Sequence, residues 1–217
     1  MRVRSWLRGV RPRPGARRSR DVALVGVAGT ALLGVSLAAP PASARFYGLT
    51  FLTAATLGIG GLATTPPQDG PRELRLVAPA ATGVAAFAVF YGCALVARRI
   101  PLLRRAIANL MRYADQGSTA AVLLTTLANG VAEEIYFRGA VYHAAPRRPV
   151  TVSTAAYVAN TAATRNPALV LAAAVMGTVF GVQRERTGGI EDALISHTIW
   201  SALMLHFMPP LFLDHRR

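Results

Sequence analysis

Lysine is absent from this chain, and acidic residues are scarce. All 24 basic residues among the 217 are Arg, only 10 residues are acidic, and the formal net charge is +14. Charged residues make up 16% of the sequence, whereas soluble domains average about 25%. Because 53% of the residues are apolar, we expect most of the chain to lie in a membrane.

Cysteine is limited to Cys93, which lies inside an apolar run. A single thiol excludes an intrachain disulfide framework and a zinc site built from cysteines. We expect Cys93 to be a small residue of the core.

The Arg residues show no pattern of a nucleic-acid-binding face. They lie between apolar runs, where anionic headgroups and the positive-inside rule both favour them. No basic segment is interleaved with aromatic residues. The sequence therefore predicts that these charges contact membrane lipid and not nucleic acid. It also predicts a multi-pass protein of a bacterial plasma membrane.

Seven apolar runs set the expected architecture. At about 1.5 Å per residue, the fifth and sixth runs reach only about 22 Å and need shielding by neighbouring helices in a bilayer core of about 30 Å. We predict an all-α, polytopic membrane bundle of six to seven helices, in one domain without internal repeats. The runs are residues 22–39, 46–65, 76–96, 118–137, 150–164, 168–182 and 190–212.

The N-terminal region combines a basic segment with the first apolar run. Residues 1–21 hold eight Arg and two Pro, which predicts a disordered cytoplasmic tail. Residues 22–39 are long enough to span a bilayer, but a basic start, an apolar core and Ala42-Ser43-Ala44 are also typical of a cleaved signal peptide. Both interpretations stay open, and residues 22–74 are assigned to N-terminal membrane helices.

A second basic cluster lies in residues 98–112. Five Arg alternate there with Ile, Leu and Met, which predicts an amphipathic helix in the membrane interface. An inside tail followed by three full spans would place this cluster outside, against the positive-inside rule. The conflict would disappear if one of the first three runs were re-entrant or lay along the membrane surface, so the sequence leaves the orientation open.

The fourth apolar run ends in Glu133, Glu134 and Arg138, which lie at or near membrane depth. Each costs at least ~2.5 kcal/mol to insert, so such residues need partners and mark a candidate site. Glu134 and Arg138 share a helix face and are expected to pair. Glu133 then points about 100° away, free to face a cavity as a general base. The alternative is a helix-end ion pair whose acids reach water.

Three further segments accompany Glu-Glu-x-x-x-Arg. They are Asn166-Pro167-Ala168-Leu169-Val170, Glu185-Arg186-Thr187-Gly188-Gly189-Ile190 and Ile195-Ser196-His197. Together these motifs resemble the CAAX protease and bacteriocin-processing (CPBP) family of intramembrane endopeptidases, over roughly residues 75–213. We expect residues 214–217 to form a tail. The resemblance implies hydrolysis of peptide bonds in membrane-associated peptide or protein substrates.

The resemblance also implies a role for each matched residue. In that family the first Glu of the pair activates a water, and Glu133 stands at its position. Glu134 and Arg138 match the pair that supports it. His197 matches the His of the last motif. Glu133 and His197 would be the protein ligands of a zinc ion.

Two positions depart from the family pattern. The middle motif, an aromatic residue followed four later by His, reads Tyr157 and Thr161 here, so a catalytic zinc would lack its third protein ligand. Ser201 replaces the Asn of the last motif and can still donate a hydrogen bond to an oxyanion. A Zn²⁺ site therefore stays open beside a metal-free mechanism, in which Glu133 takes the proton and His197 and Ser201 stabilise the oxyanion.

Other residues are weaker candidates. Phe180 with Arg184 repeats the spacing of the middle motif, but we place that pair at a helix end beside charge. His143, His206 and His215 are expected to be interface histidines.

Three functions are compatible with these residues. An endopeptidase predicts that Glu133, Glu134, Arg138 and His197 converge on one cavity. A catalytically inactive scaffold of the same fold depends only on helix packing. A small transporter needs a continuous polar path, for which the spans offer few polar residues. Substrate and oligomeric state are not indicated.

Overall fold

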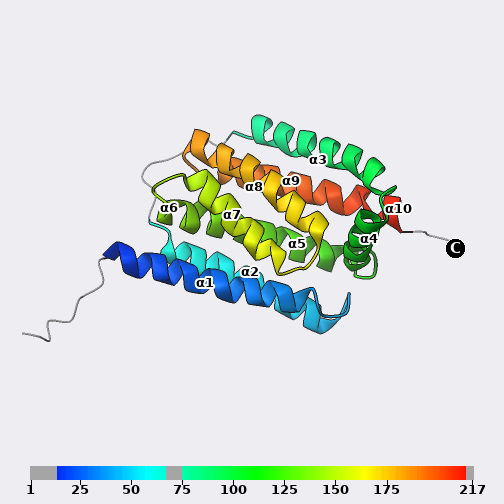
Figure 1. Ribbon diagram of the computed structural model, residues 1–217, viewed down its shortest axis with the longest axis horizontal. Coiled ribbons are helices and arrows are strands. Elements are labelled where there is room, and N and C mark those ends of the chain that lie inside the picture. The colour runs from blue at the N-terminus through cyan, green and yellow to red at the C-terminus, as the bar shows by residue number, and fades with distance from the viewer. Residues whose placement is uncertain (1–13, 67–74, 214–217) are drawn as a thin grey trace, which may run out of the picture.

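The computed structural model describes residues 14–66 and 75–213, which form a bundle of helices (Figure 1). These ranges contain no β-strand, and the predicted all-α membrane fold is confirmed. The elements are α1 (Pro14–Ser36), α2 (Ala44–Thr64), α3 (Val77–Ala97), α4 (Pro101–Asp115), α5 (Thr119–Glu133), the π-helical segment η1 (Glu134–Val141), α6 (Tyr142–Ala144), α7 (Pro149–Ala162), α8 (Pro167–Thr187), α9 (Glu191–Phe207) and α10 (Pro209–Phe212).

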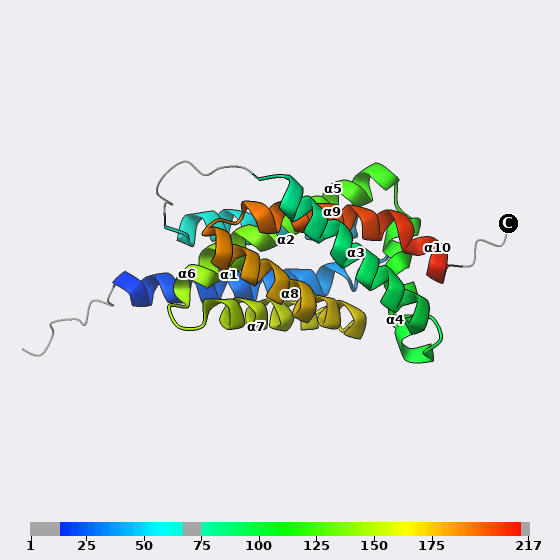
Figure 2. The ribbon, with the colours of Figure 1, turned by 90° about the horizontal axis from the view of Figure 1, so that it is seen from above.

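Each of the seven apolar runs corresponds to a helix of the bundle. Within the described ranges, α1, α2, α3 and α8 are long and apolar enough to cross a membrane. The sixth run was expected to be short, but α8 continues to Thr187, and Arg184 in this extension is buried within the bundle. The short α7 packs against α8, α1 and η1 (Figure 2), which is the shielding that its length requires.

Helix α1 begins earlier than the sequence predicted. Residues 14–21 were assigned to a disordered tail, but α1 starts at Pro14. Proline is favoured at the first position of a helix, and Arg is a good helix former, so the basic segment extends the apolar run instead of breaking it. The rest of the predicted tail, residues 1–13, and residues 214–217 lie outside the described residues.

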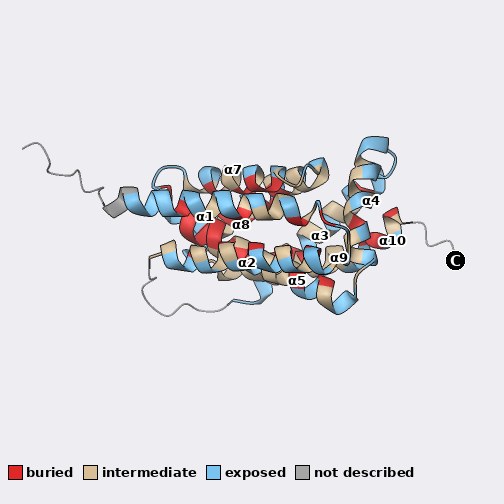
Figure 3. Ribbon diagram, turned by 90° about the horizontal axis from the view of Figure 1, so that it is seen from below, coloured by how far each residue is buried: buried red, intermediate tan, exposed pale blue. Residues whose placement is uncertain are grey.

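The continuous helix formed by α5, η1 and α6 lies at the centre of the bundle. It packs against α2, α7 and α9, and α1 and α3 cover the outside of α2 and α9. Buried residues gather toward this centre, whereas the outer helices are largely exposed (Figure 3). Large apolar side chains on these helices are exposed, including Val27, Ile59 and Val77, as expected for surfaces that face lipid.

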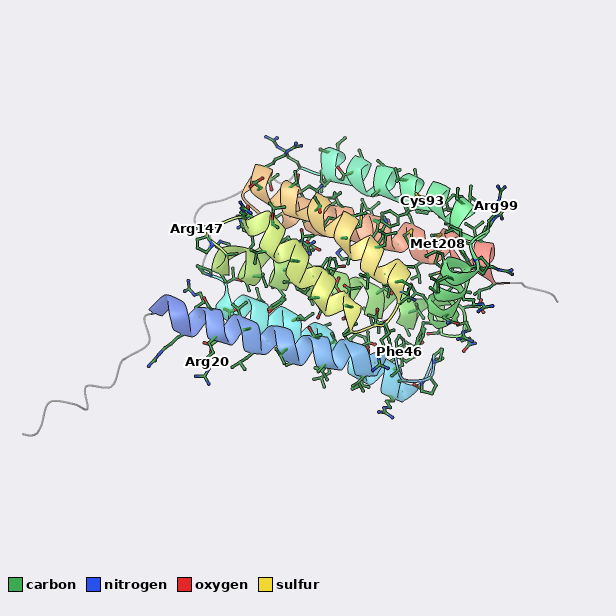
Figure 4. The ribbon with its side chains drawn as sticks, viewed as in Figure 1. Arg20, Phe46, Cys93, Arg99, Arg147 and Met208 are labelled. Atoms are coloured by element: carbon green, nitrogen blue, oxygen red, sulfur yellow. The ribbon has the colours of Figure 1, made fainter. Side chains whose placement is uncertain are left out.

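Cys93 lies on this lipid-facing surface. Its side chain is exposed on α3 (Figure 4), so the expectation of a core residue is wrong. An apolar run in a membrane protein is apolar on all sides, and its composition therefore does not tell the core-facing side from the lipid-facing side.

Arginine residues occupy both ends of the bundle. Arg20 and Arg147 lie at one end and Arg99 at the other (Figure 4). Helices α1, α2 and α3 have 23, 21 and 21 residues without an interruption, so none of them is re-entrant. Charge at both ends means that the positive-inside rule does not select an orientation.

The backbones of α2 and η1 meet at Gly61. A Cβ atom at this position would lie 3.0 Å from Cγ2 of Ile135 and 3.1 Å from Cα of Tyr136. The Tyr136 hydroxyl in turn donates a 2.7 Å hydrogen bond to the Val22 carbonyl of α1. A residue without a side chain is therefore needed where α2 supports the central helix.

We predict that Gly61→Ala lowers the free energy of unfolding in detergent by about 1–3 kcal/mol, because backbone atoms must move to admit the methyl group. Gly48→Ala is the matched control on the same helix, since a Cβ atom at that position would meet no neighbouring group within 4 Å. Thermal unfolding checks both variants. Equal losses of stability in the two would contradict the close approach of α2 and η1.

Candidate active site

Glu133 and Glu134 lie where the central helix changes from α to π geometry. Glu133 is the last residue of α5 and Glu134 the first of η1. At about 1.5 Å per residue, this junction lies roughly 20 Å from the start of α5, well inside the bundle. π-Helical turns often occur at functional sites because the wider turn redirects side chains.

The Glu134 carboxylate contacts two side chains in the interior of the bundle. Its Oε1 lies 3.3 Å from Nη1 of Arg138, and both side chains are fully buried. The same oxygen lies 2.9 Å from Nδ1 of His197, which α9 contributes. The predicted pairing of Glu134 with Arg138 is therefore present, and it extends to a histidine far away in sequence. A carboxylate at Nδ1 orients the imidazole and leaves Nε2 for other contacts.

Aromatic rings enclose the Arg138 guanidinium. Its Cζ lies 4.8 Å from the Tyr157 ring centroid and 5.2 Å from that of Phe180, at cation–π distance. The Nη2 atom donates to the Gly177 carbonyl at 3.3 Å. Phe180 also stacks on His197, with ring centroids 4.8 Å apart. Phe180 lies inside α8 and not at its end, so that part of the expectation is wrong. The charge beside it is that of Arg138 within the candidate site.

Arg184 supports the π-helical segment from α8. Its Nε donates to the Arg138 carbonyl at 3.0 Å, and its Nη2 lies 3.4 Å from Nε2 of His143. The Nδ1 atom of His143 lies 2.8 Å from the Gly139 carbonyl. A buried arginine thus provides a donor to a carbonyl of η1. Sequence reasoning missed this role, because a charge near the end of an apolar run resembles an interfacial anchor.

Glu133 faces away from this buried pair, as expected. Its Oε2 accepts a 2.8 Å hydrogen bond from the Tyr157 hydroxyl. The same oxygen lies 4.0 Å from Nε2 of His197, and the Glu133 side chain is 15% exposed. Tyr157 was not among the predicted site residues, although its place in the middle motif was a signal that could have identified it.

A cavity of about 290 Å³ lies against Glu133 and His197. Tyr157, Thr161 and Ser201 also line it, and its walls continue past α5 to α4. Glu134 and Arg138 lie behind His197 and do not line the cavity. The four residues predicted from the sequence therefore contact one another. Glu133 and His197 line the cavity, and the ion pair of Glu134 and Arg138 supports them from behind.

The side chains at the cavity do not fit a zinc site with three protein ligands. Among the described residues, no group of three or more His, Cys, Asp and Glu side chains is arranged to hold a metal ion. The Thr161 hydroxyl, which stands where the family has His, donates to the Tyr157 carbonyl at 2.8 Å. His206 is exposed, and His215 lies outside the described residues. Glu133 and His197 alone would leave zinc without its third protein ligand.

A comparison with known protein families matches the part of the fold that contains the candidate site. Residues 115–203 match the family described as Type II CAAX prenyl endopeptidase Rce1-like. This segment is CAAX-protease-like. The match runs from the end of α4 into α9 and contains every candidate site residue, so the resemblance predicted from the motifs is confirmed there. No curated protein and no solved structure matches the chain.

We predict that Tyr157→Phe lowers the free energy of unfolding by about 1 kcal/mol, the net value of one hydrogen bond. Tyr157→Leu removes the ring over Arg138 as well and is expected to cost about 3 kcal/mol or more. Equilibrium unfolding of both variants in the same detergent gives the comparison. Equal stabilities of the Phe and Leu variants would show that the ring does not support the Arg138 guanidinium.

Proposed function

We propose that the chain is an intramembrane endopeptidase in which Glu133 activates the attacking water. The observation that carries the proposal is the 4.0 Å separation of Glu133 Oε2 from His197 Nε2 at the cavity. This distance is too long for a direct hydrogen bond but suits one bridging water. A water held there would lie beside a carboxylate base and an imidazole.

The mechanism uses His197 as a hydrogen-bond donor to the oxyanion. Its Nδ1 lies 2.9 Å from Oε1 of Glu134, and Arg138 lies beside the same carboxylate. An imidazolium donates from both ring nitrogens, so Nδ1 would donate to Glu134 while Nε2 donates toward the cavity.

The reaction needs two proton transfers by Glu133. Its carboxylate takes a proton from the water as the oxygen attacks the carbonyl carbon of the peptide. The resulting oxyanion accepts hydrogen bonds from His197 Nε2 and Ser201 Oγ. Glu133 then returns the proton to the amide nitrogen, the carbon–nitrogen bond breaks, and the products are a carboxylic acid and an amine.

The donor set supports a metal-free form of this mechanism. The Thr161 hydroxyl is engaged with a backbone carbonyl, and the Tyr157 hydroxyl donates to Glu133. The hydrogen bond from Tyr157 would orient the Glu133 carboxylate for its role as a base. Thr161 in place of His is also the observation that favours the second candidate, a catalytically inactive scaffold.

The cavity favours apolar peptide segments as substrate. Besides its polar end at Glu133 and His197, its lining includes Leu110, Met111 and Trp200. Apolar side chains of a membrane-associated protein would fill such walls, while a charged segment would lose hydration without partners.

We predict that Glu133→Gln abolishes proteolysis, lowering the rate by about 10²-fold or more because the base is lost. The measurement compares protein N-termini in membranes from cells that lack this protein and are complemented with either form at equal abundance. Glu185→Gln is the matched control, since Glu185 is exposed on α8.

New N-termini that appear with the wild type and Glu185→Gln, but not with Glu133→Gln, are the expected result. Repeating the cleavage with purified protein and a zinc chelator separates the two forms of the mechanism, and unchanged activity is expected. Identical N-termini in all membranes, under conditions where the wild type rescues a phenotype, would favour the inactive scaffold.

A further inference from the structure

A second pocket, of about 280 Å³, lies between α4 and the turn from α7 to α8. Arg112 contributes to it from α4, and Arg165 from the turn. No acidic side chain is among the described residues that line it. Two arginines from separate elements therefore line one pocket, and no acidic residue lines it with them.

The side chains of the two arginines are available to a ligand. Arg112 donates one hydrogen bond from Nη2 to Oδ1 of Asn109 at 2.8 Å, which orients the guanidinium and leaves further N–H groups free of that bond. Arg165 makes no side-chain hydrogen bond or ion pair with the described residues. Both residues are exposed.

The neutral polar groups of the pocket form its frame. Asn166 donates from Nδ2 to the Ala106 carbonyl at 2.8 Å, which ties the turn to α4. The Tyr113 hydroxyl lies 2.7 and 2.8 Å from the carbonyl oxygens of Leu37 and Ala39, which ties α4 to the end of α1. These bonds fix the elements that carry Arg112 and Arg165 relative to one another.

The backbone of the turn is strained at Arg165. Its φ is 55°, in the left-handed region, which costs about 1 kcal/mol or more for a residue other than glycine. Glycine would avoid this cost, but it would remove the guanidinium from the pocket.

The position of the pocket indicates the source of its ligand. Helix α4 lies at one end of the bundle (Figures 1 and 2), buries Met111 against α10, and exposes Arg104, Arg105 and Arg112. Such an amphipathic helix lies at the level of lipid headgroups. Arginine pairs bind phosphate with charge-assisted hydrogen bonds.

We propose that this pocket binds the phosphate of an anionic phospholipid headgroup. It shares the side chains of Leu110, Tyr113 and Leu169 with the cavity at Glu133. A bound lipid therefore braces the wall that separates the interface from the candidate active site. The site needs no proteolytic activity, so its test is independent of the proposed function.

The test measures binding of phosphatidylglycerol and phosphatidylcholine to the purified protein in detergent by native mass spectrometry. We expect preferential binding of phosphatidylglycerol, and about 30-fold weaker binding in the double variant Arg112→Gln/Arg165→Gln, from about fivefold for each lost charge. Arg98→Gln/Arg99→Gln is the matched control, because it removes the same charge from exposed residues following α3.

Each remaining outcome overturns the proposal. Equal losses in the two double variants would indicate diffuse attraction to net charge instead of a pocket. Displacement of phosphatidylglycerol by an equal concentration of inorganic phosphate would indicate a site for free phosphate. The double variant Arg112→Gln/Arg165→Gln could also keep its lipid binding and lose binding of an apolar peptide with a free C-terminal carboxylate. That result would assign the pocket to substrate.

Discussion

The buried ion pair of Glu134 and Arg138 is the constraint on which the candidate site depends. Both side chains are fully buried, so each charge is tolerable only beside the other, and removal of one partner leaves an uncompensated charge at a cost of about 3–5 kcal/mol. The pair links the central helix to α9 through His197 and to α8 through the Gly177 carbonyl. One buried interaction therefore contacts all three of these helices.

This support explains how a reactive carboxylate can be kept inside an apolar bundle. Glu133 does not have to stabilise the fold, because Glu134 does so, and Glu133 is left with one hydrogen bond from Tyr157 and a place at the cavity. Arg184 adds a donor to the carbonyl of Arg138 in the π-helical segment. The cavity extends to α4, the amphipathic helix that the sequence predicts to lie in the membrane interface.

Local spacing predicted the parts of the site that lie within one helix. The pairing of Glu134 with Arg138 and the separate direction of Glu133 follow from helix geometry. The contact of Glu134 with His197 spans 63 residues, and only the family resemblance indicated it. The roles of Phe180 and Arg184 were missed. The sequence of an apolar run, and of the charges at its end, does not show whether a given side chain faces lipid, water or the protein interior. The same ambiguity misplaced Cys93. The all-α fold and the order of its long apolar helices followed from the runs, whereas the short helices α6 and α10 did not.

A double-mutant cycle on Glu134 and Arg138 tests the central claim most directly. The free energies of unfolding of Glu134→Gln, Arg138→Met and the double variant are measured in one detergent. Each single variant is predicted to lose about 3–5 kcal/mol, and the double variant no more than about either single one, because the second substitution removes the charge that the first left unpaired. Additive losses would show that the two charges do not depend on each other and would contradict the account.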